Sequence, residues 1–505
     1  MSTNSSESTR LSAPVAALIG VISLVAALGA GHLVAGFVGA GASPFFAVGN
    51  AAIDLTPGWL KEFAVRAFGT ADKTVLLTGM AAVAAALAVA AGLASRRRPA
   101  PGLAFVFVVG VLGGIAVFTR PDLGQVALLA PVVSLVAGMA VFTWLHRAAL
   151  DGWHESAARR KFLLAIAGAG VAGIAGQLIG TTKDAASSRA AVGPLVPART
   201  APPVPAGADF AKFGTPAFLT PNASFYRIDT ALVVPQVRTE DWSLRIHGMV
   251  DREVTYDWSD IRDRPLVERI VTLCCVSNPV GGPYISTARF IGVDLADLLA
   301  DAGVVPGAEQ VFSTSADGWT AGTPVSAMAD PRIGAMLAIG MNGEPLPIEH
   351  GFPARLVVPG LYGYVSATKW VTDLEVTTWD ARTPYWLQRG WAEQAPIKTE
   401  SRIDAPRDGV AAGQVRIAGI AWAQHTGIDR VEVSVDGGPW VPAELSTEVT
   451  VDAWRMWWAD VGAARGNHVV RVRATDRSGY TQTDQLADVV PDGATGWHTI
   501  TFTAR

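Results

Sequence analysis

The chain has 505 residues, more than one ordinary domain contains, and half of them are hydrophobic while only 17% are charged. The mean hydropathy of +0.31 is too high for a wholly soluble enzyme, and a net charge of −4 gives no indication of nucleic-acid binding. Residues 1–180 consist largely of Ala, Val, Leu and Gly, whereas the rest has an ordinary globular composition. We therefore expect a membrane region followed by a polar one.

Five apolar segments in the first 180 residues approach the ~20 residues that cross a bilayer. They are 13–39, 74–94, 102–118, 126–146 and 162–180, and the third is the shortest. Any one of them alone is equally explained by a buried core helix. Because five follow one another with short charged loops between them, apart from a longer mixed loop at 41–73, the sequence predicts a five-helix transmembrane region.

Basic residues gather in two of these loops, and such residues mark the cytoplasmic side of a membrane. They are Arg96, Arg97 and Arg98 after the second segment, and Arg147, Arg159, Arg160 and Lys161 after the fourth. This pattern predicts a cytoplasmic N-terminus and an extracytoplasmic location for everything after the fifth segment.

The stretch "ARRKFL" at 158–163 resembles a twin-arginine translocation motif, and a plain positively charged anchor explains it equally well. A twin-arginine signal carries a cargo that folds before export, often with its cofactor. The spans themselves are poor candidates for a haem site, because His32 and His146 are predicted near opposite leaflets. They also contain almost no charged residues, which disfavours a transporter or channel.

Residues 181–215 are rich in Pro, Ala and Ser without periodicity and predict an extended tether. Short mixed elements in 216–395, including a helix that ends at Gly303, indicate an α+β domain. In 396–505 only alternating strand patterns remain, as in "DRVEVSVDGGPW" and "NHVVRVRATDRSGY". These predict an all-β, immunoglobulin-like sandwich.

The two cysteines are adjacent, Cys274 and Cys275, at the end of the strand-like run in "VERIVTLCCVSNPVGG". Neighbouring cysteines argue against a redox pair, and the lack of a third Cys or a His cluster argues against zinc. Two interpretations remain open from the residues alone. One thiolate binds a metal that is held mainly by a cofactor, or both side chains are small buried hydrophobes, which is the more frequent case.

"TLCCVSN" resembles the Thr-Leu-x-Cys-x-Gly-Asn signature of the sulfite oxidase family of molybdopterin enzymes, with Cys275 on the molybdenum-ligating cysteine and Cys274 on the variable position before it. Further matches in the same order are "TPNASFYRID", "SADGWT" and "MNGEPLPIEHGFPARLVVPGLYGYVSATKW". The resemblance covers about 216–505. It implies cofactor contacts from Asn222, Phe225, Tyr226, Asp317, His350, Arg355, Ala367, Thr368 and Lys369.

The chemistry of these residues suits that cofactor. Molybdenum in an enedithiolate needs one more soft ligand, which a thiolate supplies. The pterin carries a phosphate, which Arg355, His350 and Lys369 can hold. "PIKTESRID" and the following sandwich resemble the family's dimerisation domain, which implies a homodimer.

The match fails around the substrate. The family's basic residues after the signature Asn are missing, because Pro279 follows, and Trp391 stands where an active-site tyrosine is expected, with Arg389 nearby. Arg227 is the remaining candidate for binding an anionic substrate.

The resemblance thus implies a bacterial plasma-membrane oxidoreductase with a molybdenum–molybdopterin cofactor, acting outside the cytoplasm on a small oxyanion or oxide through two-electron oxygen-atom transfer. Its electrons would pass to a separate cytochrome or quinone-linked partner. The alternative is a catalytically silent molybdenum-fold binding module on a membrane anchor. The direction of the reaction stays open between sulfite-type oxidation and reduction of an S- or N-oxide.

Overall fold

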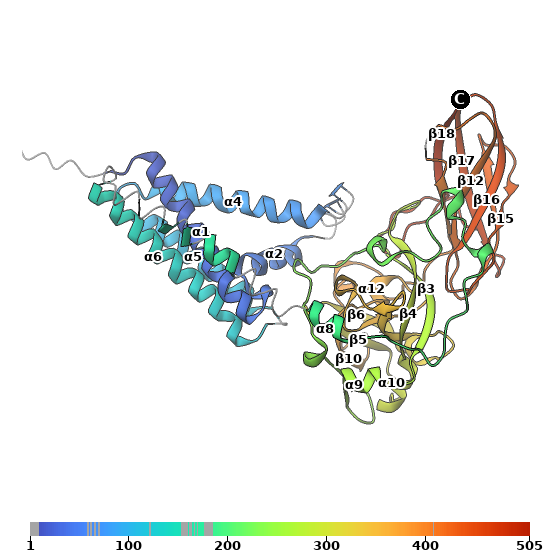
Figure 1. The fold of residues 1–505 in the computed structure, drawn as a ribbon, viewed down its shortest axis with the longest axis horizontal. Coiled ribbons are helices and arrows are strands. Elements are labelled where there is room, and N and C mark those ends of the chain that lie inside the picture. Colours follow the sequence, from blue (N-terminus) through green and yellow to red (C-terminus); the bar gives the residue numbers. More distant parts are fainter. Residues whose placement is uncertain are drawn as a thin grey trace, which may run out of the picture. The chain divides into compact units, whose positions relative to one another are not determined.

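The computed structural model describes residues 10–505 except 58–59, 61–62, 65–66, 69–70, 121–122, 153–159, 161–163, 166, 169, 176–184 and 408. The chain forms two compact units, one made of helices and one rich in sheets (Figure 1). The first contains residues 1–184 and 230–234, and the second contains 185–229 and 235–505.

Four helices within the described ranges are long and apolar enough to cross a membrane. They are α1 (Ala13–Val38), α4 (Asp72–Ala94), α5 (Ala100–Phe118) and α6 (Leu129–Gly152), which match the first four predicted segments. The fifth segment, 162–180, lies only partly within the described residues, and of the twin-arginine motif at 158–163 only Arg160 is described, so both stay predictions. The stretch 41–73 is not only a loop, because it contains the short apolar helix α2 (Pro44–Leu55), whose 12 residues are too few to cross a bilayer.

Small residues let α1 and α4 cross closely near the C-terminal end of α4. A Cβ on Gly20 would overlap the carbonyl oxygen of Ala88, and a Cβ on Gly92 would overlap that of Ala16. Such contacts are typical of helices that associate in lipid, where apolar side chains gain little from contacting one another instead of lipid. His146 is buried within the helical unit, with its Nε2 2.8 Å from the Ser95 carbonyl oxygen.

The predicted tether at 181–215 is wrong from Ala185 onward, because this stretch is packed on the second unit. It contains α8 (Ala185–Ala191), and Arg199 forms a bridge to Val267 on β3. Ala185 and Ala208 are completely buried. The Pro- and Ala-rich composition suggested a free chain. Small side chains, however, also allow an extended segment to pack closely against a folded surface.

The first part of the second unit contains two five-stranded sheets that enclose its main core. One has the order β2-β1-β10-β5-β6, in which β1 and β10 are parallel, and the other has the order β3-β4-β7-β8 with β9 paired to β7. The strands are β1 (Ser243–Gly248), β2 (Val254–Asp257), β3 (Val267–Cys274), β4 (Ile285–Asp294), β5 (Gln310–Ser315), β6 (Thr320–Pro324), β7 (Met336–Met341), β8 (Glu344–Pro345), β9 (Arg355–Val357) and β10 (Val371–Thr377).

Short helices connect these strands, as expected for an α+β domain. They are α9 (Trp258–Arg262), α10 (Leu295–Ala302), α11 (Val325–Ala329) and α12 (Gly363–Ser366). The predicted end of a helix at Gly303 is correct, and its φ of +75° explains the glycine, since this left-handed conformation is strained for other residues.

The C-terminal part contains two four-stranded antiparallel sheets around a shared apolar core. Their orders are β11-β12-β16-β15 and β14-β13-β17-β18. The strands are β11 (Glu400–Ala405), β12 (Gly413–Trp422), β13 (Ile428–Val435), β14 (Val441–Pro442), β15 (Glu444–Leu445), β16 (Arg455–Ala463), β17 (Gly466–Asp476) and β18 (Thr499–Ala504). The all-β character is as predicted, and an immunoglobulin-like topology stays a prediction.

Strand β3 is bonded to both parts of the second unit. It pairs along its length with β4. On its other side, the backbone N–H of Thr272 donates to the Asp452 carbonyl at 2.9 Å, and the Thr272 hydroxyl accepts from the Trp454 N–H at 2.8 Å. The end of this strand is therefore fixed from two directions.

Candidate functional site

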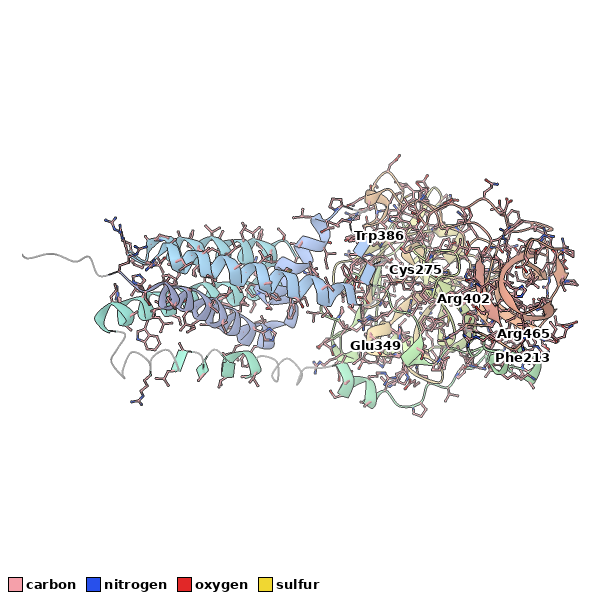
Figure 2. The ribbon with its side chains drawn as sticks, turned by 90° about the horizontal axis from the view of Figure 1, so that it is seen from above. Phe213, Cys275, Glu349, Trp386, Arg402 and Arg465 are labelled. Carbon is pink, nitrogen blue, oxygen red and sulfur yellow. The ribbon has the colours of Figure 1, made fainter. Side chains whose placement is uncertain are left out.

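Cys275 follows the last residue of β3 and lies in the tight connection to β4. Its N–H donates to the Tyr284 carbonyl at 2.9 Å, and its carbonyl accepts from the Asn278 N–H at 3.0 Å. The Asn278 Oδ1 in turn accepts from the Tyr284 N–H at 2.8 Å. These bonds fix the backbone of the thiol. Figure 2 marks Cys275 inside the sheet-rich unit.

The two cysteines have different surroundings. Cys274 is 2% exposed and belongs to the apolar core shared with the C-terminal sheets, next to Tyr362 and Ile420. Burial raises the pKa of its thiol well above the ordinary value. Cys275 is 9% exposed; burial raises its pKa too, while hydrogen bonds from Ser277 lower it. Hydrogen bonding to sulfur stabilises a thiolate, so Cys275 is the better metal ligand of the pair.

Tyr226 is the aromatic residue that interacts with this thiol. Burial raises the pKa of its phenol well above 10, the two cysteines raise it further, and Arg355 lowers it. Its ring stacks on Phe225, with 5.5 Å between the centroids, and Phe225 meets His350 edge-on at 5.5 Å. The phenol therefore stays protonated at neutral pH and remains a hydrogen-bond donor.

Arg355 is a buried cation, 5% exposed. Its guanidinium donates to the carbonyls of His350 at 3.2 Å and Ala367 at 3.4 Å. Within the described part of the chain, no carboxylate forms an ion pair with it, and burial lowers its pKa to about 10. Burial of an unpaired charge is costly, which indicates that an anion belongs beside it.

His350 lies directly beside that guanidinium and is 3% exposed. Its Nε2 is 3.1 Å from the Asn222 carbonyl oxygen, so this ring nitrogen carries the proton. Burial and the charges of Arg355 and Lys369 lower its pKa to about 4. The imidazole is therefore a neutral donor at physiological pH.

Lys369 lies on the same loop as Ala367 and Thr368. Its Nζ donates to Asp229 Oδ2 at 2.7 Å and to the Glu349 carbonyl at 3.2 Å. Both side chains of the ion pair are nearly buried, at 10% and 6% exposure. The Thr368 hydroxyl lies 2.7 Å from that of Ser313 and is enclosed in the core, so this residue fixes the loop.

Arg227 and Asn222 lie at the rim of this group. Arg227 is 43% exposed and lies 3.7 Å from Asp229 Oδ2. The Asn222 amide nitrogen donates to Glu344 Oε1 at 2.5 Å, while its oxygen accepts from Asn342 at 2.8 Å. Only its backbone carbonyl contacts His350. Through these two hydrogen bonds, the side chain of Asn222 holds the loop that contains it in place.

Asp317 lies at the turn between β5 and β6, where its Oδ1 accepts from the Trp319 N–H at 3.2 Å. The neighbouring Ala316 N–H donates to the Trp370 carbonyl at 2.8 Å, which places this turn against the 367–370 loop. Trp391 is 4% exposed and packs against Tyr364 and Trp386. The Arg389 guanidinium lies 3.6 Å above the Tyr385 ring and donates to that residue's carbonyl.

Three residues of the site were not found from the sequence: Asp229, Asn342 and Asn278. Asp229 balances Lys369, and it follows "FYRI" directly, but a single carboxylate carries no signal of its partner. Asn342 has a φ of +51°, which the Asn-Gly pair in "MNGE" indicates. The Nδ2 of Asn278 is buried with no hydrogen-bond partner among the described residues, so it is a donor available beside Cys275.

These residues define a class of site: a strand-end thiol, a protonated phenol, and a buried group of donors that consists of the cations Arg355 and Lys369 and the neutral His350. The thiol suits a soft metal, and the cation and donors suit a phosphate. The unpaired guanidinium and the free amide of Asn278 are the features that a bound anionic cofactor would satisfy. The residues present therefore fit a pterin-held metal.

Comparison with known proteins agrees with this class. The family model "Oxidoreductase molybdopterin binding domain" matches residues 231–386. Sulfite oxidase from Gallus gallus is 31% identical over 322 residues, covering 54% of this chain and 70% of its own. Mitochondrial sulfite oxidase from Macaca fascicularis is 30% identical and covers 54% of this chain and 59% of its own, so the chain spans about three fifths of that relative.

The chain belongs to the sulfite oxidase family of molybdopterin-dependent oxidoreductases. Its cofactor is accordingly the molybdenum–molybdopterin group. A further relative, the nitrate reductase [NADPH] of Emericella nidulans, is 34% identical over 192 residues, covering 34% of this chain and 22% of its own.

Proposed function

We propose that this protein is a membrane-anchored oxidoreductase that transfers an oxygen atom and two electrons at a molybdenum–molybdopterin cofactor. The observation that carries the proposal is the buried Arg355, which forms no ion pair within the described residues and donates to the carbonyls of His350 and Ala367, in the same unit as the buried thiol of Cys275 at the end of β3. When bound, the molybdenum supplies the two-electron oxygen transfer. Four helices that are long and apolar enough to cross a membrane support the anchoring.

The protein's own residues have separable roles in this proposal. Cys275 Sγ holds the metal, and the backbone bonds to Tyr284 and Asn278 keep the sulfur in place. Arg355, neutral His350 and Lys369 hold the phosphate of the pterin. Tyr226, whose raised pKa keeps it protonated, donates a hydrogen bond to an oxygen of the substrate or product.

The remaining predicted contacts complete the cofactor site. The stacked rings of Phe225 and Tyr226 line one side of the cofactor site. Ala367, Thr368 and the turn at Asp317 line the side to which the 367–370 loop belongs. Asn222 acts through its carbonyl, which orients His350. Residues 216–395 form the extracytoplasmic catalytic domain in this proposal, and the sheets of residues 396–505 form the surface for a homodimer.

The substrate is a small oxyanion or oxide, and Arg227 is its binding cation. It is half-exposed, and the carboxylate it faces, Asp229, is already held by Lys369 at 2.7 Å against 3.7 Å for Arg227. Named relatives include enzymes for sulfite and for nitrate, so both directions of oxygen transfer are compatible with the fold. Electrons pass to a separate partner protein or a quinone-linked carrier.

Steady-state assays on the molybdenum-loaded full chain test this proposal. Sulfite oxidation and sulfoxide reduction are measured with artificial electron carriers, for the wild type, Arg227→Ala and the surface control Arg245→Ala. We expect turnover in one direction, and a KM for an anionic substrate that rises at least about tenfold in Arg227→Ala alone, since a charge-assisted contact is lost. A loaded protein with no turnover in either direction would contradict the proposal.

A further inference from the structure

The helical unit contains an apolar crevice that the catalytic chemistry does not use. Its volume is about 470 Å³, within the range of ligand pockets, and it lies between α4 and the helices α1, α2, α5 and α6. α4 touches α1 closely only toward its C-terminal end, at Ala88 and Gly92. Figure 1 shows the axes of α4 and α1 diverging toward the N-terminal end of α4.

The crevice is almost entirely apolar, and the polar side chains in its lining are those of Ser23 and Ser134. The hydroxyl of Ser23 donates to the Ile19 carbonyl of its own helix at 2.8 Å. The rest of the lining consists mainly of Ala, Val, Leu, Gly, Phe and Met side chains. An apolar cavity of this kind does not hold water and instead accepts hydrocarbon.

The shape of the crevice distinguishes a chain from a compact ligand. On α4 its lining runs from Val75 to Ala91, which is about 24 Å along the helix axis at 1.5 Å per residue. This is most of the ~30 Å thickness of the hydrocarbon core of a bilayer. A lining of this length suits an extended hydrocarbon chain better than a compact ligand. The lining offers no buried charge or free amide for the polar ring of a quinone.

The glycine at position 79 of α4 leaves space open in the crevice. A Cβ at this position would meet nothing within 4 Å, yet the residue lines the crevice in the middle of a helix, where glycine costs about 1 kcal/mol relative to alanine. Gly114 on α5 also has open space around it but does not line the crevice. The two glycines therefore form a matched pair for substitution.

We propose that this crevice binds one acyl chain of a membrane phospholipid, which fills the space between α4 and the rest of the bundle. The proposal rests on the membrane location included in the proposed function and on none of its chemistry. The bound chain would lie along α4 between Val75 and Ala91.

Native mass spectrometry of the full chain, after extended washing in mild detergent, tests the proposal. The wild type and Gly114→Leu should each retain one phospholipid per protomer, while Gly79→Leu should retain at least about tenfold less. Ala84→Leu, a second substitution that fills the crevice, should behave like Gly79→Leu. Equal retention in all variants, no lipid in the wild type, or a retained quinone in place of a phospholipid would overturn it.

Crosslinking separates a lipid from a segment of the chain as the occupant. A photo-reactive residue placed at position 79 should label a phospholipid. A crosslink only to the chain's own residues 162–180 would overturn the proposal. The molybdenum content of every variant should equal that of the wild type, so a failure here is distinguishable from a failure of the catalytic assignment.

Discussion

The helical and sheet-rich units differ in which residues they expose and which they bury. In the helical unit, large apolar side chains such as Phe107, Leu112 and Val136 are more than half exposed, while small residues form the contacts between helices. In the sheet-rich unit the apolar residues are inside, and Arg355, His350 and Glu400 are buried with them. Exposed hydrocarbon marks the surface for lipid, and buried charge marks the site for a ligand.

Replacement of the unpaired buried cation should give the largest effect. Arg355→Met should lower molybdopterin content at least about a hundredfold, because the phosphate loses its fully desolvated partner. The same change should stabilise the cofactor-free protein by about 1–3 kcal/mol, because it removes a buried charge without a carboxylate. Cofactor analysis checks the expected loss of molybdopterin, and thermal unfolding checks the expected gain in stability. Unchanged cofactor content would show that the cation serves only the fold.

The contacts between helices provide the corresponding test in the other unit. Gly20→Leu should destabilise the helical unit in detergent by about 3–5 kcal/mol, because its side chain would overlap the backbone of α4 at Ala88. Gly114→Leu is the control, with open space at the new side chain, and should change stability by less than about 1 kcal/mol. Equal effects of the two substitutions would contradict the packing described for α1 and α4.

Glu400 tests the cost of buried charge by pH. Its Oε1 has no hydrogen-bond partner in the described part of the chain, and burial raises its pKa to about 8. The folded state therefore binds a proton that the unfolded state has lost, and stability falls as pH rises from about 4.5 to 8, by about 1.4 kcal/mol per pH unit from this group. Glu400→Gln should remove that slope in unfolding curves measured across the window. A slope that persists would assign the pH dependence to other groups.

A surface pair gives the smallest expected effect. Arg416 and Asp460 form two hydrogen bonds at 2.8 and 2.7 Å between exposed strands of the C-terminal sheets. Arg416→Met should cost less than about 1 kcal/mol in thermal unfolding, because solvent screens exposed ion pairs. A cost as large as that of Gly20→Leu would mean that surface charge, and not burial, dominates the stability of this unit.

The sequence predicted three of the long helices to within two residues and the fourth, α6, to within six, because a span needs only length and hydropathy. It also predicted the strand that ends at the cysteines, while the cofactor contacts implied by the motifs stay predictions. The prediction of an extended tether was wrong for residues 185–215, because amino-acid composition does not reveal whether a segment packs on a folded surface. Asp229 was also missed, since a partner for Lys369 that is 140 residues away is set only by the fold.

The central claim is that Cys275, and not its neighbour, binds molybdenum. X-ray absorption at the molybdenum edge of the loaded full chain tests this claim directly. The account predicts that Cys275→Ser loses one sulfur scatterer relative to the wild type, while Cys274→Ser keeps the wild-type spectrum, because Cys274 lies in the apolar core. An unchanged spectrum in Cys275→Ser, or the loss of sulfur in Cys274→Ser instead, would contradict it.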